Sequence, residues 1–223
     1  GLLPFLFLFG FIGVLLILQP STTIAIIIFS AALVTYFAAG AKIRFLLTAG
    51  ALIVMSVLLL IFITPYRFDR LKSYINPDTD QQGISYHINQ ALIAIGSGGI
   101  SGIGFGESTT KLKQLPEPLA DSIFAIIGEE LGFIGSIALV LLFLFLILRG
   151  LIIAKNAPDT FGRLLATGFI SVIGIQTFIN IGAVSGILPL TGVPLPFISY
   201  GGTALVVFLT MSGIIVNISK QRK

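Results

Sequence analysis

The chain has 223 residues, of which 56% are hydrophobic and 10% are charged, and its formal net charge is +4. A water-soluble domain with a mean hydropathy of +1.06 would expose large apolar patches, so the composition excludes soluble classes and predicts an integral membrane protein. The absence of cysteine excludes a disulfide framework and a thiolate metal site.

Six apolar segments approach the length of about 20 residues that a membrane-spanning helix needs. In chain order they cover residues 3–19, 21–40, 45–64, 122–148, 164–188 and 201–218. Pro20 separates the first two, because its ring cannot continue a helix, and we interpret them as a helical hairpin. The sequence therefore predicts an all-α, polytopic integral membrane protein: a helical bundle with about six transmembrane helices.

Cations mark the expected orientation. They cluster in two short connections and at the C-terminus: Lys42 and Arg44; Arg149, Lys155 and Arg163; Lys220, Arg222 and Lys223. Because Lys and Arg near span ends are retained in the cytoplasm, we expect these clusters and both chain ends to be cytoplasmic. The predicted organisation is three spans in residues 1–64, a long extracytoplasmic loop in residues 65–121, and three spans with a short tail in residues 122–223.

The long loop contains two recognisable segments. Apolar positions in residues 86–95 recur at spacings of three and four, which predicts a short amphipathic helix at the membrane interface. The Gly-rich stretch 95–106 follows, but it lacks the preceding strand and the Lys-Ser/Thr pair of a phosphate-binding loop. No nucleotide cofactor is therefore expected, and the glycines are interpreted as permitting positive φ and close approach to a ligand or a neighbouring helix.

Eight of the nine acidic residues lie in this loop or in the first turns of the span after it, so the outer face is the expected working face. Asp121 stands at a helix N-terminus, where the helix dipole favours a carboxylate, and capping and catalysis remain equally open for it. Glu129 and Glu130 lie about 12 Å deeper along the helix. Acids at that depth face a bundle interior, a water-filled cavity or a cation, or else form a structural polar cluster.

Other polar residues suggest contacts with a substrate. Arg67, Lys111 and Lys113 in the loop either are simply solvated or bind phosphate groups. Cations for a pyrophosphate beside an acid for a hydroxyl proton would suit transfer from a lipid-linked phosphosugar. His87 is the only histidine, so neither a metal cluster nor a histidine triad is expected, and we interpret it as solvated or interfacial.

The connection before the last span is stiffened by three prolines. Ser199, Gly201 and Gly202 open that span, where the glycines either let backbone N–H groups approach an anion or allow close packing on a neighbouring helix.

Several motifs in the same order resemble those of the SEDS family of FtsW, RodA and SpoVE: Gln19-Pro20, Thr64-Pro65-Tyr66-Arg67, Tyr86-His87-Ile88-Asn89-Gln90, the Gly-rich stretch, residues 115–132, and residues 195–203. The resemblance implies a peptidoglycan glycosyltransferase that polymerises lipid II at the outer face of the bacterial plasma membrane, during division or elongation. It also implies as partners undecaprenyl-linked glycan, a class B penicillin-binding transpeptidase and other divisome or elongasome proteins, and no nucleic acid.

Within this resemblance, Asp121 matches the essential family aspartate. Its implied role is general base on the acceptor sugar hydroxyl, or ligand of a divalent cation such as Mg²⁺ or Mn²⁺ that holds the pyrophosphate leaving group. The candidate substrate-binding residues are Arg67, Lys111, Lys113, Glu117, Glu129, Glu130, Ser199, Gly201 and Gly202.

The chain also departs from the family pattern. Many members have His-Thr-Asp-Phe-Ile-Phe where this chain has residues 119–124, so hydrogen-bonding side chains beside the acid are expected to be missing. The family has ten spans and this chain matches roughly the last six, which predicts a fragment and leaves open whether it is active by itself. The subfamily resemblance leans towards FtsW.

Two other functions remain open. A flippase for a lipid-linked precursor would also use the intramembrane acids Glu129 and Glu130. A scaffold that only docks the transpeptidase would need the spans but not Asp121.

Overall fold

The computed structural model describes residues 22–64, 84–108 and 120–221, together with residues 7, 10–13, 15, 68, 72, 74 and 75. Regular structure in these residues is helical, as the sequence predicts for an all-α polytopic membrane protein. The helices are α2 (Thr22–Ala38), α3 (Ile43–Ile63), α5 (Ile84–Ser97), α7 (Ile123–Lys155), α8 (Thr160–Val184) and α9 (Gly202–Lys220).

Three of the described helices, α7, α8 and α9, are long and apolar enough to cross a membrane. Each matches a predicted span, and α5 matches the amphipathic helix expected in residues 86–95. α8 begins earlier than predicted, at Thr160, because the Asp159 carboxylate caps it by accepting a hydrogen bond from Gly162 N at 2.8 Å. The expected span 3–19 and the break at Pro20 lie largely outside the described residues, so the number of six spans stays a prediction.

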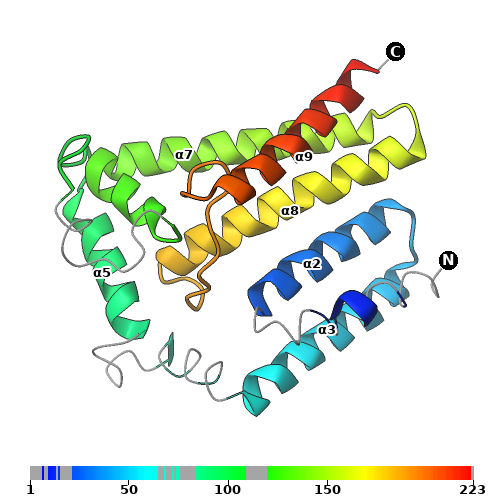
Figure 1. Cartoon of the computed structure of the whole chain (residues 1–223), viewed down its shortest axis with the longest axis horizontal. Helices are drawn as coiled ribbons and strands as arrows, with labels where there is room; N and C mark the ends of the chain where they lie inside the picture. The colour runs from blue at the N-terminus through cyan, green and yellow to red at the C-terminus, as the bar shows by residue number, and fades with distance from the viewer. Residues whose placement is uncertain are drawn as a thin grey trace.

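Helix α8 lies at the centre of the bundle. It contacts α2, α5, α7 and α9, whereas α3 packs along α2. In Figure 1, α7 and α8 run side by side and α9 crosses them. The α2–α3 and α7–α8 connections and the C-terminal end of α9 lie at one end of the bundle, and α5 lies at the other. The connections that carry the clustered cations therefore gather at the end opposite to α5.

Helix α7 is interrupted near its start. Gly132 has φ 67° and ψ −162°, a conformation that leaves backbone groups on both sides of it without helical partners. The Gly-rich stretch supplies the missing partners, since Ile103 N and Gly104 N donate to the carbonyl oxygens of Glu129 and Glu130, both at 3.1 Å. In the other direction, Phe133 N donates to Gly99 O at 2.9 Å, and Ile134 N donates to Ile100 O at 3.2 Å.

This exchange of hydrogen bonds needs glycines in the Gly-rich stretch, because its backbone lies against that of α7. A Cβ at Gly98 would overlap the carbonyl oxygen of Gly128, and one at Gly102, where φ is +80°, would overlap that of Glu130. The interpretation of the glycines as a close approach to a neighbouring helix is confirmed for these positions.

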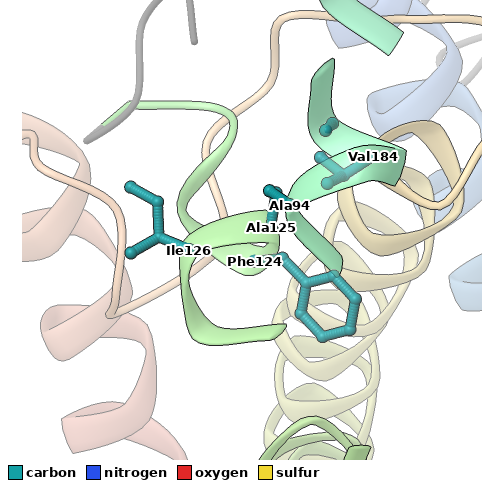
Figure 2. Close-up of a cluster of buried hydrophobic side chains, with 6 residues drawn as sticks. Ala94, Phe124, Ala125, Ile126 and Val184 are labelled. Carbon is teal, nitrogen blue, oxygen red and sulfur yellow. The ribbon is translucent and has the colours of Figure 1, made fainter. Parts of the chain in front are cut away.

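A buried apolar cluster joins three elements beneath the start of α7. It contains Ala91 and Ala94 of α5, residues 124–126 of α7, and Val184 of α8. Figure 2 shows Phe124 and Ile126 extending to opposite sides of the first turn of α7, with Ala94 and Val184 close to Ala125. Because close-packed side chains resist displacement, this cluster holds the start of α7 in place, and with it Asp121, two residues earlier.

Candidate functional site

Asp121 lies two residues before α7 begins and is partly buried. The N-cap residue of α7 is Ser122, whose side chain makes no capping hydrogen bond. Asp159 shows what a capping aspartate does in this chain, since it is itself the N-cap of α8 and accepts a bond from the helix backbone. The geometry therefore favours the catalytic alternative for Asp121 over the capping alternative.

Asn180 of α8 fixes the backbone at Asp121. Its side chain is 1% exposed, and its Nδ2 donates to Asp121 O at 2.8 Å and to Val193 O at 2.7 Å. One amide thus ties the start of α7 to the connection between α8 and α9, residues 185–201, which we call the α8–α9 connection. A Cβ at Gly192 in this connection would lie 3.6 Å from Asp121 Oδ2, so the carboxylate faces the connection at a residue without a side chain.

His87 reaches the same site from α5. Its Nε2 lies 2.7 Å from Ser122 Oγ, and Ser122 Oγ donates to Asp121 Oδ1 at 3.3 Å. The expectation of a solvated or interfacial His87 is wrong, because the side chain is 8% exposed and faces the start of α7. The expectation that hydrogen-bonding side chains beside the acid are missing is also wrong, since Ser122 supplies a hydroxyl on its C-terminal side.

Glu129 and Glu130 are buried, at 2% and 8% exposure. Glu129 Oε2 accepts a hydrogen bond from Ser108 Oγ at 2.5 Å, and the carbonyl groups of both residues bind the Gly-rich stretch. These contacts favour the structural alternative, in which the two acids help to join the outer segment to the interrupted part of α7.

The residues that open the last span have separate positions. Ser199 Oγ accepts from Leu195 N at 2.7 Å, which closes a turn of the α8–α9 connection and gives this hydroxyl a structural role. Gly202 is the first residue of α9, and a Cβ there would meet no atom of the described residues within 4 Å. Among the described residues, a Cβ at Gly201 would meet Ala204 Cβ at 3.6 Å, which is ordinary contact. Within the described part of the chain neither glycine is in close contact with a neighbouring helix, and the two alternatives for them stay predictions.

Four candidate substrate-binding residues lie outside the described residues: Arg67, Lys111, Lys113 and Glu117. Their roles stay predictions.

The structure adds polar residues that sequence reasoning missed: His87, Ser108, Ser122 and Asn180. For His87 a signal was present, because it shares one face of α5 with the buried Ala91 and Ala94, at spacings of four and three. For Asn180, an amide within an apolar span indicated an interior contact but not its partners.

A family model of cell cycle proteins, FtsW, RodA and SpoVE, matches residues 1–223 of the chain. Stage V sporulation protein E of Bacillus subtilis is 43% identical over 92% of this chain and 56% of its own length. A probable peptidoglycan glycosyltransferase FtsW of Geobacter metallireducens is 40% identical over 100% of this chain and 60% of its own length. The peptidoglycan glycosyltransferase MrdB of Escherichia coli is 41% identical over 92% and 56%. The chain thus spans somewhat more than half the length of these curated relatives.

Solved structures share the fold. A chain from a study of polymerization and crosslinking by a peptidoglycan synthase complex superposes with a TM-score of 0.73 at 26% identity, over 93% of this chain and 58% of that one. A mutant of the Thermus thermophilus rod shape determining protein RodA superposes with a TM-score of 0.61 at 27% identity, over 93% and 53%. With the family match over every residue, these similarities show that the chain belongs to the FtsW, RodA and SpoVE family of cell cycle proteins.

Proposed function

We propose that this chain forms the catalytic part of a peptidoglycan glycosyltransferase that polymerises lipid II, with Asp121 as its central residue. The observation that carries the proposal is the placement of this carboxylate. Asn180 holds its backbone, Ser122 binds Oδ1, and Oδ2 faces the α8–α9 connection at Gly192. The names of the relatives, peptidoglycan glycosyltransferases in two of the three described above, support the same reaction class.

In the proposed reaction, a sugar hydroxyl oxygen of one lipid-linked substrate forms a bond to the anomeric carbon of another. The bond between that carbon and the pyrophosphate breaks, and the lipid pyrophosphate leaves with the electron pair. Asp121 accepts the hydroxyl proton as general base, which lowers the barrier to attack. The hydrogen bond from Ser122 keeps one carboxylate oxygen occupied and so directs the other towards the substrate.

A role for Asp121 as ligand of Mg²⁺ or Mn²⁺ is the alternative form of the proposal. Among the described residues, no three His, Cys, Asp or Glu side chains lie close enough to hold a metal ion between them. One carboxylate together with phosphate oxygens is nevertheless a common Mg²⁺ site, so Asp121 fits this role. Such a cation would neutralise charge on the pyrophosphate leaving group.

The proposed location is the plasma membrane, with Asp121 at the outer face and both ends of this chain in the cytoplasm. The cation-bearing connections lie at the end of the bundle opposite to α5, which supports this orientation. The proposed partner is a class B penicillin-binding transpeptidase, because one structural neighbour comes from a complex that coordinates polymerization and crosslinking. Lipid II and its undecaprenyl-linked products are the proposed substrates.

The test compares Asp121→Asn with Asp159→Asn in the complete gene product, purified in detergent with its cognate transpeptidase. Asp159 is the matched control, because it is an aspartate at a helix start whose carboxylate accepts a hydrogen bond from Gly162 N of its own helix. We expect labelled lipid II to be polymerised by the wild type and Asp159→Asn but not by Asp121→Asn, with rates measured with and without a chelator.

Equal amounts of glycan product from both variants would show that the Asp121 carboxylate is not needed for the reaction. Absence of product from the wild type in the assembled complex would point instead to transport or scaffolding. Loss of the transpeptidase complex in Asp121→Asn alone would favour the scaffold.

A further inference from the structure

His87, Ser122 and Asp121 form a continuous hydrogen-bonded chain that runs from α5 to the site. His87 and Ser122 are buried, at 8% and 1% exposure, whereas Asp121 is partly exposed. Nε2 of His87 lies 2.7 Å from Ser122 Oγ, which lies 3.3 Å from Asp121 Oδ1. The imidazole is therefore the more buried part of this chain, and the carboxylate is the more exposed part.

The hydrogen count sets the direction of these bonds. A serine hydroxyl has one hydrogen, and the hydrogen bond to the Asp121 carboxylate, which can only accept, uses it. With that hydrogen used, Ser122 Oγ accepts from His87 in the tautomer that carries its hydrogen on Nε2, and this is the tautomer that we assign. A side chain that only accepts hydrogen bonds at residue 87 would instead attract the hydroxyl hydrogen away from the carboxylate.

We propose that His87 is a positioning residue for Asp121, which it orients by donating a hydrogen bond to Ser122 Oγ. This inference rests on the proposed function of Asp121. By holding the hydroxyl in one orientation, His87 keeps Oδ1 engaged and turns Oδ2 towards the α8–α9 connection at Gly192.

Two features of the fold make His87 suitable for this role. Its helix face also contains Ala91 and Ala94, which pack in the cluster with Phe124 and Ala125 of α7 (Figure 2). α5 and the start of α7 therefore share a close-packed contact, and the imidazole has little freedom to move relative to Ser122. The Ser122 hydroxyl is also not used to cap α7, although serine is a preferred capping residue, which leaves its hydrogen for the carboxylate.

The experiment measures lipid II polymerisation by the complete gene product in its transpeptidase complex for four variants: His87→Leu, His87→Gln, Ser122→Ala and the double variant His87→Leu/Ser122→Ala. Gln90→Leu is the matched control, because it makes the same kind of polar-to-apolar change one turn along α5. We expect His87→Leu and Ser122→Ala each to lower kcat about 10- to 100-fold with little change in KM, as a misplaced catalytic group does. His87→Gln, which keeps a donor near the Nε2 position, should recover most of kcat.

The double variant separates positioning from packing. If His87 acts through Ser122, the double variant is no slower than Ser122→Ala alone, because the second change removes an interaction already lost. Additive losses, an unchanged kcat in His87→Leu, or an equal loss in Gln90→Leu would overturn the inference. If His87→Leu fails to fold, Ser122→Ala and His87→Gln still test the inference. A wild-type kcat in Ser122→Ala would overturn the inference as well.

Asp121→Asn is measured in parallel. An inactive Asp121→Asn with a fully active His87→Leu would refute only the role of His87. An active Asp121→Asn would refute the proposed function itself.

Discussion

Asp121 and Asp159 both stand at the start of a long apolar helix, yet their carboxylates have different partners. Asp159 caps its own helix through Gly162 N. Asp121 contacts the hydroxyl of Ser122, and its backbone is held by Asn180 from another helix. Since a helix N-terminus favours a carboxylate in both cases, the local sequence could not separate the two roles. Part of the difference lies in Asn180, which is 59 residues away from Asp121 in the sequence.

At this scale we predict that Asn180→Ala reduces polymerisation more than Gln176→Ala. Both side chains hold the α8–α9 connection, Gln176 through Pro194 O at 2.9 Å, but only Asn180 also binds the backbone of Asp121. Removing Asn180 leaves two carbonyl groups without this donor, which should cost about 1–3 kcal/mol of stability. Thermal melting in detergent measures the loss of stability, and initial rates well below the melting temperature measure the loss of polymerisation. Equal rates for Asn180→Ala and Gln176→Ala would contradict the role of Asn180 in holding Asp121.

Among the elements, α7 departs most from its expected form. The segment was predicted as one uninterrupted span, and its apolar run does continue to Lys155. The interruption at Gly132 was not predicted, because a glycine in an apolar helix is compatible with an unbroken helix. It becomes necessary only where the Gly-rich stretch approaches closely enough to exchange backbone hydrogen bonds with α7.

We predict that Gly132→Ala destabilises the protein by about 3 kcal/mol or more, because it combines a positive φ with a steric overlap. The new Cβ would overlap Gly102 N and lie 2.7 Å from Ile100 O. Gly213→Ala in α9 is the control, since a Cβ there meets no atom of the parts of the chain that the structure describes within 4 Å, and alanine favours a helix by about 1 kcal/mol. Thermal unfolding in detergent should separate the variants, and equal melting temperatures would show that the interruption is not required.

For the whole molecule, the arrangement of charge agrees with a single orientation in the membrane. The α2–α3 and α7–α8 connections and the end of α9 lie together, at the end of the bundle opposite to α5 (Figure 1). Lys and Arg in such short connections are retained in the cytoplasm, which would place Asp121 outside.

The orientation can be tested with introduced thiols, because the chain has no cysteine of its own. Ser101 in the Gly-rich stretch and Pro158 in the α7–α8 connection are both exposed. We expect a membrane-impermeant maleimide to label Ser101→Cys in intact spheroplasts, and to label Pro158→Cys only after lysis. Labelling of Pro158→Cys in intact spheroplasts would show the opposite orientation, with Asp121 on the cytoplasmic side.

The sequence by itself determined the features that depend on composition and periodicity. Burial of apolar side chains and a spacing of three and four are properties of a segment, so the all-α membrane fold and the existence of α5 and α7 to α9 could be predicted. The order of motifs was enough to indicate the family, whereas the role of Asp121 stays a prediction.

Only the tertiary structure decided which polar groups meet. His87 of α5 meets Ser122 at the start of α7, and Asn180 of α8 meets Val193 in the α8–α9 connection. No periodicity in the sequence encodes such contacts between elements. For Glu129, of its two open alternatives, the hydrogen bond from Ser108 favours the structural one. The physical reason is that hydrogen bonds depend on distances of about 3 Å between groups, which are set by the packing of whole helices.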